Sequence, residues 1–241
     1  MKVLISPISM SEAQAVIDGG ADIIDVKNIN EGSLGASFPW IIRGIVDRFK
    51  NSGVLFSATL GDLPHKPGTA SLAALGAAAS GAQYIKAGLH GTTNYEEAAA
   101  VMSAVVRACR DFDPDITVVA AGYADNRRFS GLDPRALVRA AADSKADLVM
   151  LDTAVKDGRT LFDALKAAEL RNFIDHAKSC GLLTALAGSV RFEHIETIRD
   201  LGADVVGVRG AVCEANDRKT GIRAELVRRF VKQCRAGTAA A

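Results

Sequence analysis

The chain of 241 residues lacks paired cysteines, long apolar runs and an excess of charge of either sign. Its four cysteines stand far apart and form no CxxC pair, which argues against a disulfide scaffold or a paired-cysteine zinc site. No stretch approaches the roughly 20 uninterrupted apolar residues of a membrane span, and the first residues hold too short an apolar run for a signal peptide. A formal net charge of +1 gives no support to a nucleic-acid or anionic-membrane partner. We therefore expect a cytoplasmic protein with reduced thiols that binds neither nucleic acid nor membrane.

Two further signals are missing. The histidines show no metal-ligand spacing, so we expect no metal site. The segment Ser6–Ser9, after the first apolar run, contains no GxGxxG motif, which argues against a dinucleotide-binding open sheet.

What the chain does contain is a regular alternation of short apolar runs and longer segments of helical period. We expect strands at Val3–Ile8, Ile23–Lys27, Val54–Leu60, Tyr84–Leu89, Thr117–Tyr123, Leu148–Ala154, Leu183–Ser189 and Val205–Ala211. We expect helices to begin near Ser11, Pro39, Thr69, Asn94, Pro134, Leu165, Phe192 and Ile222. Ser11, Asn94 and Asp133 are candidate N-caps.

Eight strands, each followed by a helix, predict an α/β protein that forms a single (β/α)₈ TIM barrel of the class I aldolase type. The length is close to the roughly 250 residues typical of that fold, although two small domains or a doubly wound sheet would also fit it. We place the catalytic barrel at residues 1–235 and expect a disordered tail at 236–241.

An internal repeat supports the barrel. Related segments precede every second predicted strand, and their alanines are spaced by 61, 64 and 57 residues, about a quarter of the chain. The segments are Gly20-Ala21-Asp22, Gly81-Ala82-Gln83, Lys145-Ala146-Asp147 and Gly202-Ala203-Asp204. The repeat indicates four successive units of two strands and two helices.

Side-chain alternation then separates the two faces of these four strands. Odd positions after each repeat alanine are aliphatic and should face the outer helices. They are Ile24, Val26, Ile85, Ala87, Val149, Leu151, Val206 and Val208. Every charged strand residue has the other parity, so we expect Asp25, Lys27, Lys86, Asp152 and Arg209 to meet inside the barrel near its C-terminal mouth. Five such charges are more than a packing network requires, because burial of an unpaired charge costs several kcal/mol.

Two lysines in one site indicate carbonyl chemistry. One ammonium lowers the pKa of the other, and the resulting neutral amine attacks an aldehyde or ketone to form a Schiff base. Asp25 and Asp152 are suited to orient an ammonium and to relay protons. Lys156 falls on the loop after the sixth strand. The sequence does not decide whether it is exposed to solvent or has a catalytic role.

The ends of the seventh and eighth strands predict a phosphate site. Gly188-Ser189 and Arg209-Gly210 follow these strands, and barrels of this kind often bind phosphate there through glycine amides. Arg209 adds a cation suited to bidentate phosphate contact. The glycine-rich loop 32–40, next to Lys27, is compatible with a lid, a second phosphate clamp or a plain connector.

Several motifs together resemble one known family, that of (5-formylfuran-3-yl)methyl phosphate synthase, over nearly all the chain. The motifs are Asp25–Lys27, Gly32–Ala36, Lys66–Thr69, Tyr84–Lys86, Val118–Asp125, Leu151–Gly158 and Gly207–Ala211. The resemblance implies a TIM-barrel lyase that condenses two glyceraldehyde 3-phosphate molecules, with loss of one phosphate and two waters, on the way to methanofuran-type C1 carriers. It implies no metal and no cofactor.

The resemblance also assigns roles to residues. Lys27 matches the Schiff-base lysine of the family and Lys86 its proton-transfer lysine, while Asp25, Asp152 and Lys156 match its other functional positions.

Three alternatives stay open at this point: another class I aldolase acting on a triose or deoxysugar phosphate, an isomerase that uses the two aspartates without a Schiff base, and a regulatory barrel that binds triose phosphate without turnover. The sequence also leaves the oligomeric state open, although we expect alanine-rich helix surfaces such as Ala98–Ala100 to be exposed and available for pairing into a homo-oligomer.

Overall fold

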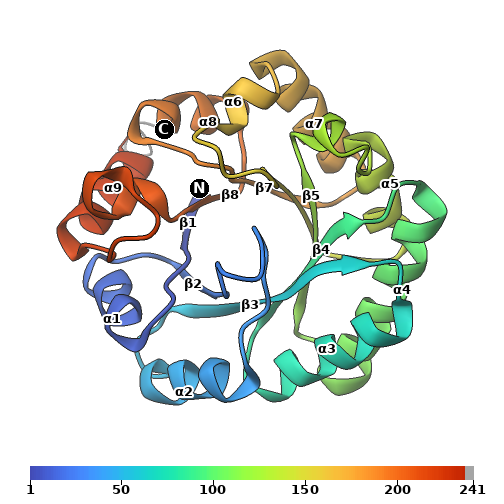
Figure 1. Ribbon diagram of the computed structural model, residues 1–241, viewed down its shortest axis with the longest axis horizontal. Helices are drawn as coiled ribbons and strands as arrows, with labels where there is room; N and C mark the ends of the chain where they lie inside the picture. Colours follow the sequence, from blue (N-terminus) through green and yellow to red (C-terminus); the bar gives the residue numbers. More distant parts are fainter. Residues whose placement is uncertain (237–241) are drawn as a thin grey trace.

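Eight parallel strands close into a barrel in the computed structural model, which describes residues 1–236 (Figure 1). The strands pair in chain order from β1 to β8, and β8 returns to β1. They are β1 (Lys2–Ile5), β2 (Ile23–Val26), β3 (Leu55–Pro64), β4 (Tyr84–Gly91), β5 (Thr117–Tyr123), β6 (Leu148–Asp152), β7 (Leu183–Leu186) and β8 (Val205–Val208). The predicted TIM barrel is therefore confirmed. Of the expected tail, residues 237–241 lie outside the described part of the chain.

Helices surround the barrel as an outer ring (Figure 1). They are α1 (Met10–Asp18), α2 (Pro39–Phe49), α3 (Pro67–Ala79), α4 (Tyr95–Phe112), α5 (Pro134–Asp143), α6 (Leu161–Ala164), α7 (Ala167–Ser179), α8 (Ile195–Leu201) and α9 (Ala224–Arg235). Short 3₁₀ turns occur at η1 (Asn126–Arg128), η2 (Phe192–His194), η3 (Gly210–Val212) and η4 (Glu214–Asn216). None of the helices in residues 1–236 is both long and apolar enough to cross a membrane.

Two of the three predicted N-caps are correct. Asn94 accepts a hydrogen bond from Glu97 N, and Asp133 accepts one from Arg135 N. The prediction for α1 was wrong, because Ser9 rather than Ser11 has the extended backbone of a cap, with φ of −146°, and its hydroxyl accepts from Glu12 N. Ser11 lies inside the first helical turn.

Strand ends differ from the predictions at the mouth of the barrel. β1, β7 and β8 stop three residues earlier than expected. Pro7 follows β1, Gly188 and Ser189 have positive φ after β7, and η3 begins at Gly210 after β8. By contrast, β3 extends to Pro64, and its pairing with β4 shifts register between Thr59 and Asp62. This irregularity lies beside the loop between β2 and α2, which is described below.

The two predicted faces of the strands are confirmed. Aliphatic residues of one parity, such as Ile24 and Leu151, belong to the core between the barrel and its helices. Ile23, Met150 and Val205 belong to a separate core inside the barrel. The inner core is small, and it therefore leaves the mouth to polar side chains.

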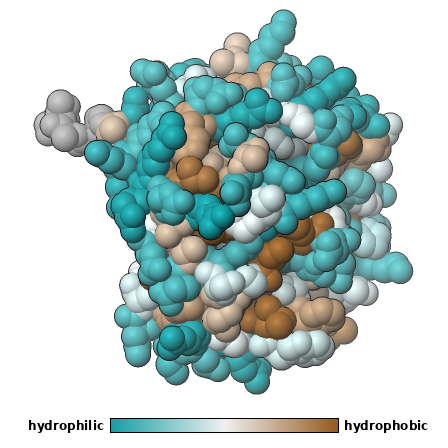
Figure 2. All heavy atoms as spheres, turned by 60° about the vertical axis from the view of Figure 1, so that its left-hand side comes forward, coloured by the Kyte–Doolittle hydropathy of each residue, from teal (hydrophilic) through white to brown (hydrophobic). Residues whose placement is uncertain are grey.

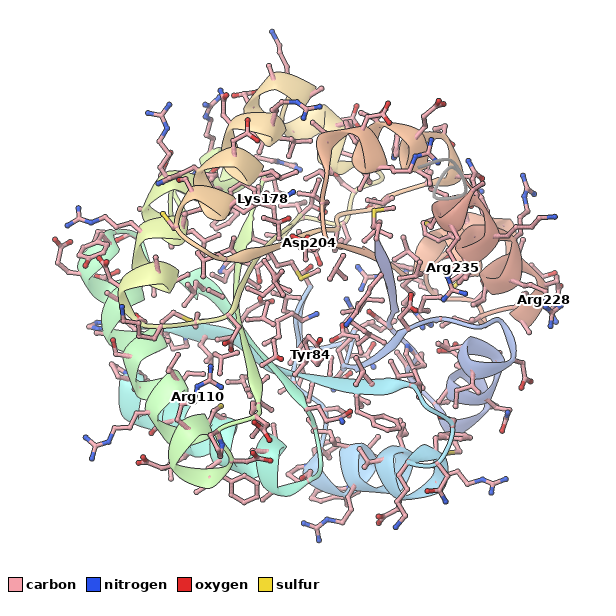
Figure 3. All side chains as sticks on the ribbon, turned by 180° about the vertical axis from the view of Figure 1, so that it is seen from behind. Tyr84, Arg110, Lys178, Asp204, Arg228 and Arg235 are labelled. Atoms are coloured by element: carbon pink, nitrogen blue, oxygen red, sulfur yellow. The ribbon has the colours of Figure 1, made fainter. Side chains whose placement is uncertain are left out.

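The repeated segments have a clear structural role at the opposite end of the barrel (Figure 3). The residue after each repeat alanine accepts a hydrogen bond from a backbone N–H of the preceding strand. These bonds run from Val3 N to Asp22 at 2.7 Å, Phe56 N to Gln83 at 3.1 Å, Val118 N to Asp147 at 2.6 Å and Thr184 N to Asp204 at 2.8 Å. Each one ties the start of a strand to the strand that follows it, so the repeat serves stability at the end away from the mouth.

The outer surface carries only limited apolar patches among hydrophilic side chains on the face shown in Figure 2. The largest exposed apolar side chains include Trp40 and Leu72, which are 67% and 72% exposed. The expectation that Ala98–Ala100 forms an exposed surface was wrong in part, because Ala98 is fully buried in the outer core.

Candidate active site

A cavity of about 580 Å³ opens at the carboxyl ends of the strands. Leu4 and Met150 of the inner core lie at its base. Its remaining lining is mostly polar and comes from the ends of β1, β2, β4, β6, β7 and β8 and from the loops that follow. The charged lining residues are Asp25, Lys27, Lys86, Asp152, Lys156, Arg191, Glu193, Arg209, Asp217 and Arg218. The five charged strand residues predicted to converge all line this cavity.

Asp25 and Lys86 form an ion pair in the wall of the cavity, with Oδ2 and Nζ 2.8 Å apart. Both side chains are almost completely buried. The Asp25 carboxylate also accepts hydrogen bonds from the hydroxyls of Ser6 at 3.0 Å and Ser57 at 2.8 Å. Burial works to raise the pKa of Asp25, but Lys86 and Lys27 outweigh it and hold that pKa below its ordinary value. Asp25 is thus a fixed anion beside two lysines.

Lys27 follows the last residue of β2 and is only 8% exposed. Burial lowers the pKa of its ammonium to about 8, although the carboxylates of Asp152 and Asp25 counteract the effect and the ammonium groups of Lys86 and Lys156 add to it. Its Nζ donates to the carbonyl oxygen of Ser33 at 3.2 Å. An amine with this pKa is partly neutral near pH 7, and a neutral amine is the reactive form toward carbonyl carbon.

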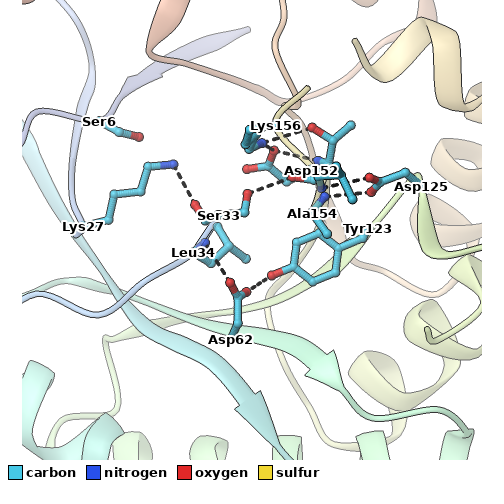
Figure 4. A network of polar contacts seen from close by, with 12 residues as sticks. Ser6, Lys27, Ser33, Leu34, Asp62, Tyr123, Asp125, Asp152, Ala154 and Lys156 are labelled. Carbon is cyan, nitrogen blue, oxygen red and sulfur yellow. Dashed lines mark hydrogen bonds and ion pairs between the residues drawn. The ribbon is translucent and has the colours of Figure 1, made fainter. Parts of the chain in front are cut away.

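Asp152 and Lys156 form a second ion pair on the other side of the cavity, with Oδ1 and Nζ 2.7 Å apart (Figure 4). Burial works to raise the pKa of Asp152, but Lys156 and Lys27 lower it to about 2. Lys156 also donates to Thr153 Oγ1 at 3.0 Å. Its side chain is 20% exposed, so this loop lysine belongs to the cavity rather than to the outer surface.

Asp125, which was not predicted as a site residue, holds the loop that carries Lys156. Its two carboxylate oxygens accept from Ala154 N at 2.7 Å and Val155 N at 3.0 Å. Asp125 is 6% exposed and follows β5. An acid at the end of an apolar strand was the available signal for this role.

The loop between β2 and α2 crosses part of the mouth (Figure 4). Leu34 at its centre is fully buried and joins the inner core. Ser33 Oγ donates to Thr153 O at 2.8 Å, and Thr59 donates to Gly35 O at 2.6 Å. The loop is therefore held both to β3 and to the segment after β6, while the lining of the cavity comes from β1, β2, β4, β6, β7 and β8 and their loops.

Asp62 holds this loop in place, and the sequence pattern did not identify it as a site residue. Its carboxylate accepts from Leu34 N at 3.4 Å and from the hydroxyl of Tyr123 (Figure 4). Burial raises the pKa of Asp62. Gly88 opposite lacks a side chain where a Cβ would meet Asp62 Oδ1 at 2.9 Å. The register shift in β3 turns this acid toward the barrel axis, and alternation alone does not reveal such a shift.

Gly188, Ser189 and Gly210 line the cavity where they were predicted. Gly188 has a φ of +106°, and a Cβ there would meet Thr153 N at 3.0 Å, so glycine is required. Ser189 also has a positive φ, of 49°. The backbone thus turns sharply after β7 and presents polar groups to the cavity.

Arg209 differs from its predicted role. Its guanidinium forms a buried salt bridge with Glu12, with Nη1 and Oε2 2.7 Å apart. All five of its N–H groups are used, because Nε donates to Arg218 O and the terminal nitrogens donate to Glu12, Ser6 O and Thr220 O. Direct phosphate binding by Arg209 is therefore not supported. It ties α1 to the loop after β8 instead.

Within residues 1–236, no three His, Cys, Asp or Glu side chains gather in a way that would hold a metal ion.

Comparison with known proteins places this cavity in context. Residues 3–231 match the family model described as 4-HFC-P synthase. The chain is 56% identical to the (5-formylfuran-3-yl)methyl phosphate synthase of Archaeoglobus fulgidus over 227 residues, which cover 94% of this chain and 96% of the relative. It is 57% identical to the protein of that name from Methanothermobacter thermautotrophicus, with coverage of 92% and 93%. It is 52% identical to the one from Methanocaldococcus jannaschii, with coverage of 98% and 100%.

Solved structures share the fold at low sequence identity. 3-Hexulose-6-phosphate synthase from Salmonella typhimurium superposes with a TM-score of 0.66 at 19% identity and covers 97% of this chain and 100% of that one. KGPDC from Streptococcus mutans also gives 0.66, at 10% identity, and covers 97% of both chains.

Proposed function

Because the chain belongs to the (5-formylfuran-3-yl)methyl phosphate synthase family, we propose that it condenses two molecules of glyceraldehyde 3-phosphate into that furan phosphate through a Schiff base on Lys27. The enzyme would be a carbon–oxygen lyase that acts on phosphates. The observation that carries the proposal is the buried Lys27, whose pKa is lowered to about 8 in the cavity. Membership of the family supports the product, and the cavity supports the chemistry.

Carbonyl capture comes first in this proposal. The neutral amine of Lys27 attacks the aldehyde carbon of one triose phosphate, and loss of water from the carbinolamine gives the iminium ion. Asp25 and Asp152 both act electrostatically on Lys27 from the cavity wall. They would stabilise the positive charge of the iminium in place of the ammonium charge.

Proton transfer would use the two ion pairs. Removal of a proton from the carbon next to the iminium gives an enamine, and this step needs a base within hydrogen-bond reach. Lys86 with Asp25 and Lys156 with Asp152 each combine an ammonium and a carboxylate within 2.8 Å. Each pair can therefore give up or accept a proton on its own side of the substrate.

The overall stoichiometry follows from the product. One triose loses inorganic phosphate, which breaks a carbon–oxygen bond, and one carbon–carbon bond joins the two three-carbon units. Ring closure and loss of two waters give the furan, which keeps the second phosphate. Deprotonation and reprotonation accompany each step, and no oxidant or reductant is needed.

The cellular setting is part of the proposal. The furan phosphate would supply the furan of a methanofuran-type C1 carrier. The substrate and the product are small charged metabolites, which fits a cytoplasmic enzyme without nucleic-acid or membrane partners. Assembly into a homo-oligomer is compatible with the proposal and is not required by it.

Peptide mass spectrometry after incubation with glyceraldehyde 3-phosphate and borohydride tests the Schiff base. We expect a reduced triose adduct on Lys27 and none on Lys178, which lies at the opposite end of the barrel (Figure 3). The same incubation without borohydride should yield a furan aldehyde that absorbs in the near ultraviolet.

The two readouts separate the alternatives. An adduct on Lys27 without furan would replace the synthase proposal by an ordinary class I aldolase. Turnover to furan without an adduct on any lysine would rule out the Schiff base and favour acid–base catalysis by Asp25 and Asp152.

A further inference from the structure

The charges that line the cavity are almost all paired. Lys86 pairs with Asp25, Lys156 with Asp152, and Arg209 with Glu12, each at 2.7 or 2.8 Å, while Arg191 has Glu193 at 3.8 Å. Among the described residues, two lining cations have no carboxylate within salt-bridge distance, namely Lys27 and Arg218.

These two cations differ in how they can respond to burial. Lys27 can lose its proton, and burial makes this loss easier by lowering its pKa to about 8. A guanidinium does not lose its proton in a protein. A charge partner for Arg218 therefore has to come from a bound molecule or from solvent.

Arg218 lines the cavity next to Gly210, where a Cβ added to the glycine would lie 4.0 Å from Arg218 Cβ. Burial lowers the pKa of its guanidinium, the carboxylate of Asp152 counteracts this effect, and Arg209 adds to it. Asp152 and Arg209 line the same cavity as Arg218. No side-chain hydrogen bond holds its five N–H donors among residues 1–236.

The buried pair of Arg209 and Glu12 sets the position of this loop. Arg209 Nε donates to the backbone carbonyl of Arg218 at 2.8 Å, and Nη2 donates to that of Thr220 at 3.4 Å. Both bonds use the backbone of the loop, so they persist when the side chain of residue 218 is changed. Arg209 is thereby a positioning residue for the Arg218 side chain.

Neutral donors also line this cavity. The backbone N–H groups of Gly188, Ser189 and Gly210 donate to no acceptor in the described chain, and all three residues line the cavity. A guanidinium with a planar fork of donors, combined with free backbone N–H groups, matches the oxygens of a phosphate group.

From this arrangement we propose that Arg218 binds the phosphate of the triose captured by Lys27, together with the backbone N–H groups after β7 and β8, and that Arg209 and Glu12 position it. The assignment rests on the proposed function for the identity of the substrate. It replaces Arg209 by Arg218 as the phosphate ligand.

Calorimetric titration with glycerol 3-phosphate tests the proposal, because this compound carries the phosphate but no carbonyl and cannot form a Schiff base. We expect Arg218→Ala to weaken its binding at least about tenfold, which is the effect of losing a charge-assisted hydrogen bond. Arg218→Lys should recover only part of the affinity, since lysine lacks the fork. Lys219→Ala is the matched control, because Lys219 is the exposed neighbour and does not line the cavity. It should bind like the wild type.

A second measurement separates phosphate recognition from damage to the site. Borohydride trapping of unphosphorylated glyceraldehyde on Lys27 should proceed in Arg218→Ala at the wild-type rate. Wild-type protein that fails to bind glycerol 3-phosphate, an Arg218→Ala variant that binds it unchanged, or equal loss of glyceraldehyde trapping would each overturn the assignment. Absence of furan formation by the wild type would count against the proposed function alone, because the titration does not depend on that reaction.

Discussion

Lys27 Nζ lies 3.2 Å from the carbonyl oxygen of Ser33, six residues further along the chain. The amine that we propose as the nucleophile is therefore in contact with the loop that covers part of the mouth. A secondary iminium keeps one N–H, which can donate to the same carbonyl. The loop would then orient the bound substrate as well as shield it from water.

The pH dependence of carbonyl capture should report the pKa of Lys27. The neutral amine is the reactive form, so the rate of borohydride trapping should rise with pH and level off above about 8. Asp152→Asn removes a carboxylate that favours the ammonium form, so the midpoint should move to lower pH. A trapping rate independent of pH between 6 and about 9 would contradict this assignment.

Burial of the Lys27 ammonium should also lower the stability of the fold. Its pKa is about 8 in the folded chain and 10.5 in the reference state, so burial of the ammonium destabilises the fold by up to about 3 kcal/mol at pH 7. Lys27→Met should raise the free energy of unfolding by a part of that amount, while catalysis is lost. The unfolded state binds more protons between pH 8 and 10.5, so wild-type stability should rise with pH across that window relative to Lys27→Met. Urea unfolding of both proteins at pH 7 and pH 10 measures the difference.

Asp25 and Lys86 should behave as a coupled pair. Asp25→Asn leaves the ammonium of Lys86 buried without its partner, which typically costs about 3–5 kcal/mol. The double variant Asp25→Asn with Lys86→Met removes the unpaired charge and should recover a large part of this loss, but no activity. Denaturant unfolding and furan formation give the two readouts. Additive losses of stability would mean that the two residues act independently.

The hydrogen bonds of Asp62 should stabilise the loop between β2 and α2 in its position over the mouth. Asp62→Ala removes the acceptor for Leu34 N and for Tyr123, so amide exchange in residues 28–36 should become faster and turnover should fall. Tyr123→Phe removes only one of the two donors and is the milder control. Hydrogen exchange read by mass spectrometry locates the change. Unaltered exchange in this loop would show that the buried Leu34 and the bonds of Ser33 and Gly35 hold it without Asp62.

The residues after the repeat alanines should matter for stability alone. Asp204→Ala leaves Thr184 N without its acceptor at the end of the barrel away from the cavity, and we expect a loss of about 1–3 kcal/mol. The KM for glyceraldehyde 3-phosphate should stay at the wild-type value. A large change in KM would instead connect that end of the barrel to the cavity.

Regular features of the fold were open to prediction from sequence. Strand alternation placed Asp25, Lys86 and Asp152 inside the barrel, because a side chain two residues along a strand returns to the same face. Caps with a standard geometry, such as Asn94 and Asp133, were equally readable.

Other features depend on irregular backbone or on partners distant in the chain. Asp62 reaches the interior only through the register shift in β3, and alternation gives no sign of that shift. Arg209 was assigned to phosphate because Glu12, 197 residues away, cannot be identified as its partner from local pattern. Arg218 lies on a loop whose path is set by that same pair.

Each of the four hydrogen bonds of the repeat, such as those from Val3 N to Asp22 and from Thr184 N to Asp204, joins two residues of the same βαβ segment. A stretch of gene that encodes such a segment therefore carries its own means of fixing two strands in register. Four tandem copies of the segment would each supply one such bond at the same end of the barrel, and the loops at the other end would be free to differ between copies. The barrel is thus of a kind that repetition of a quarter-length segment can build.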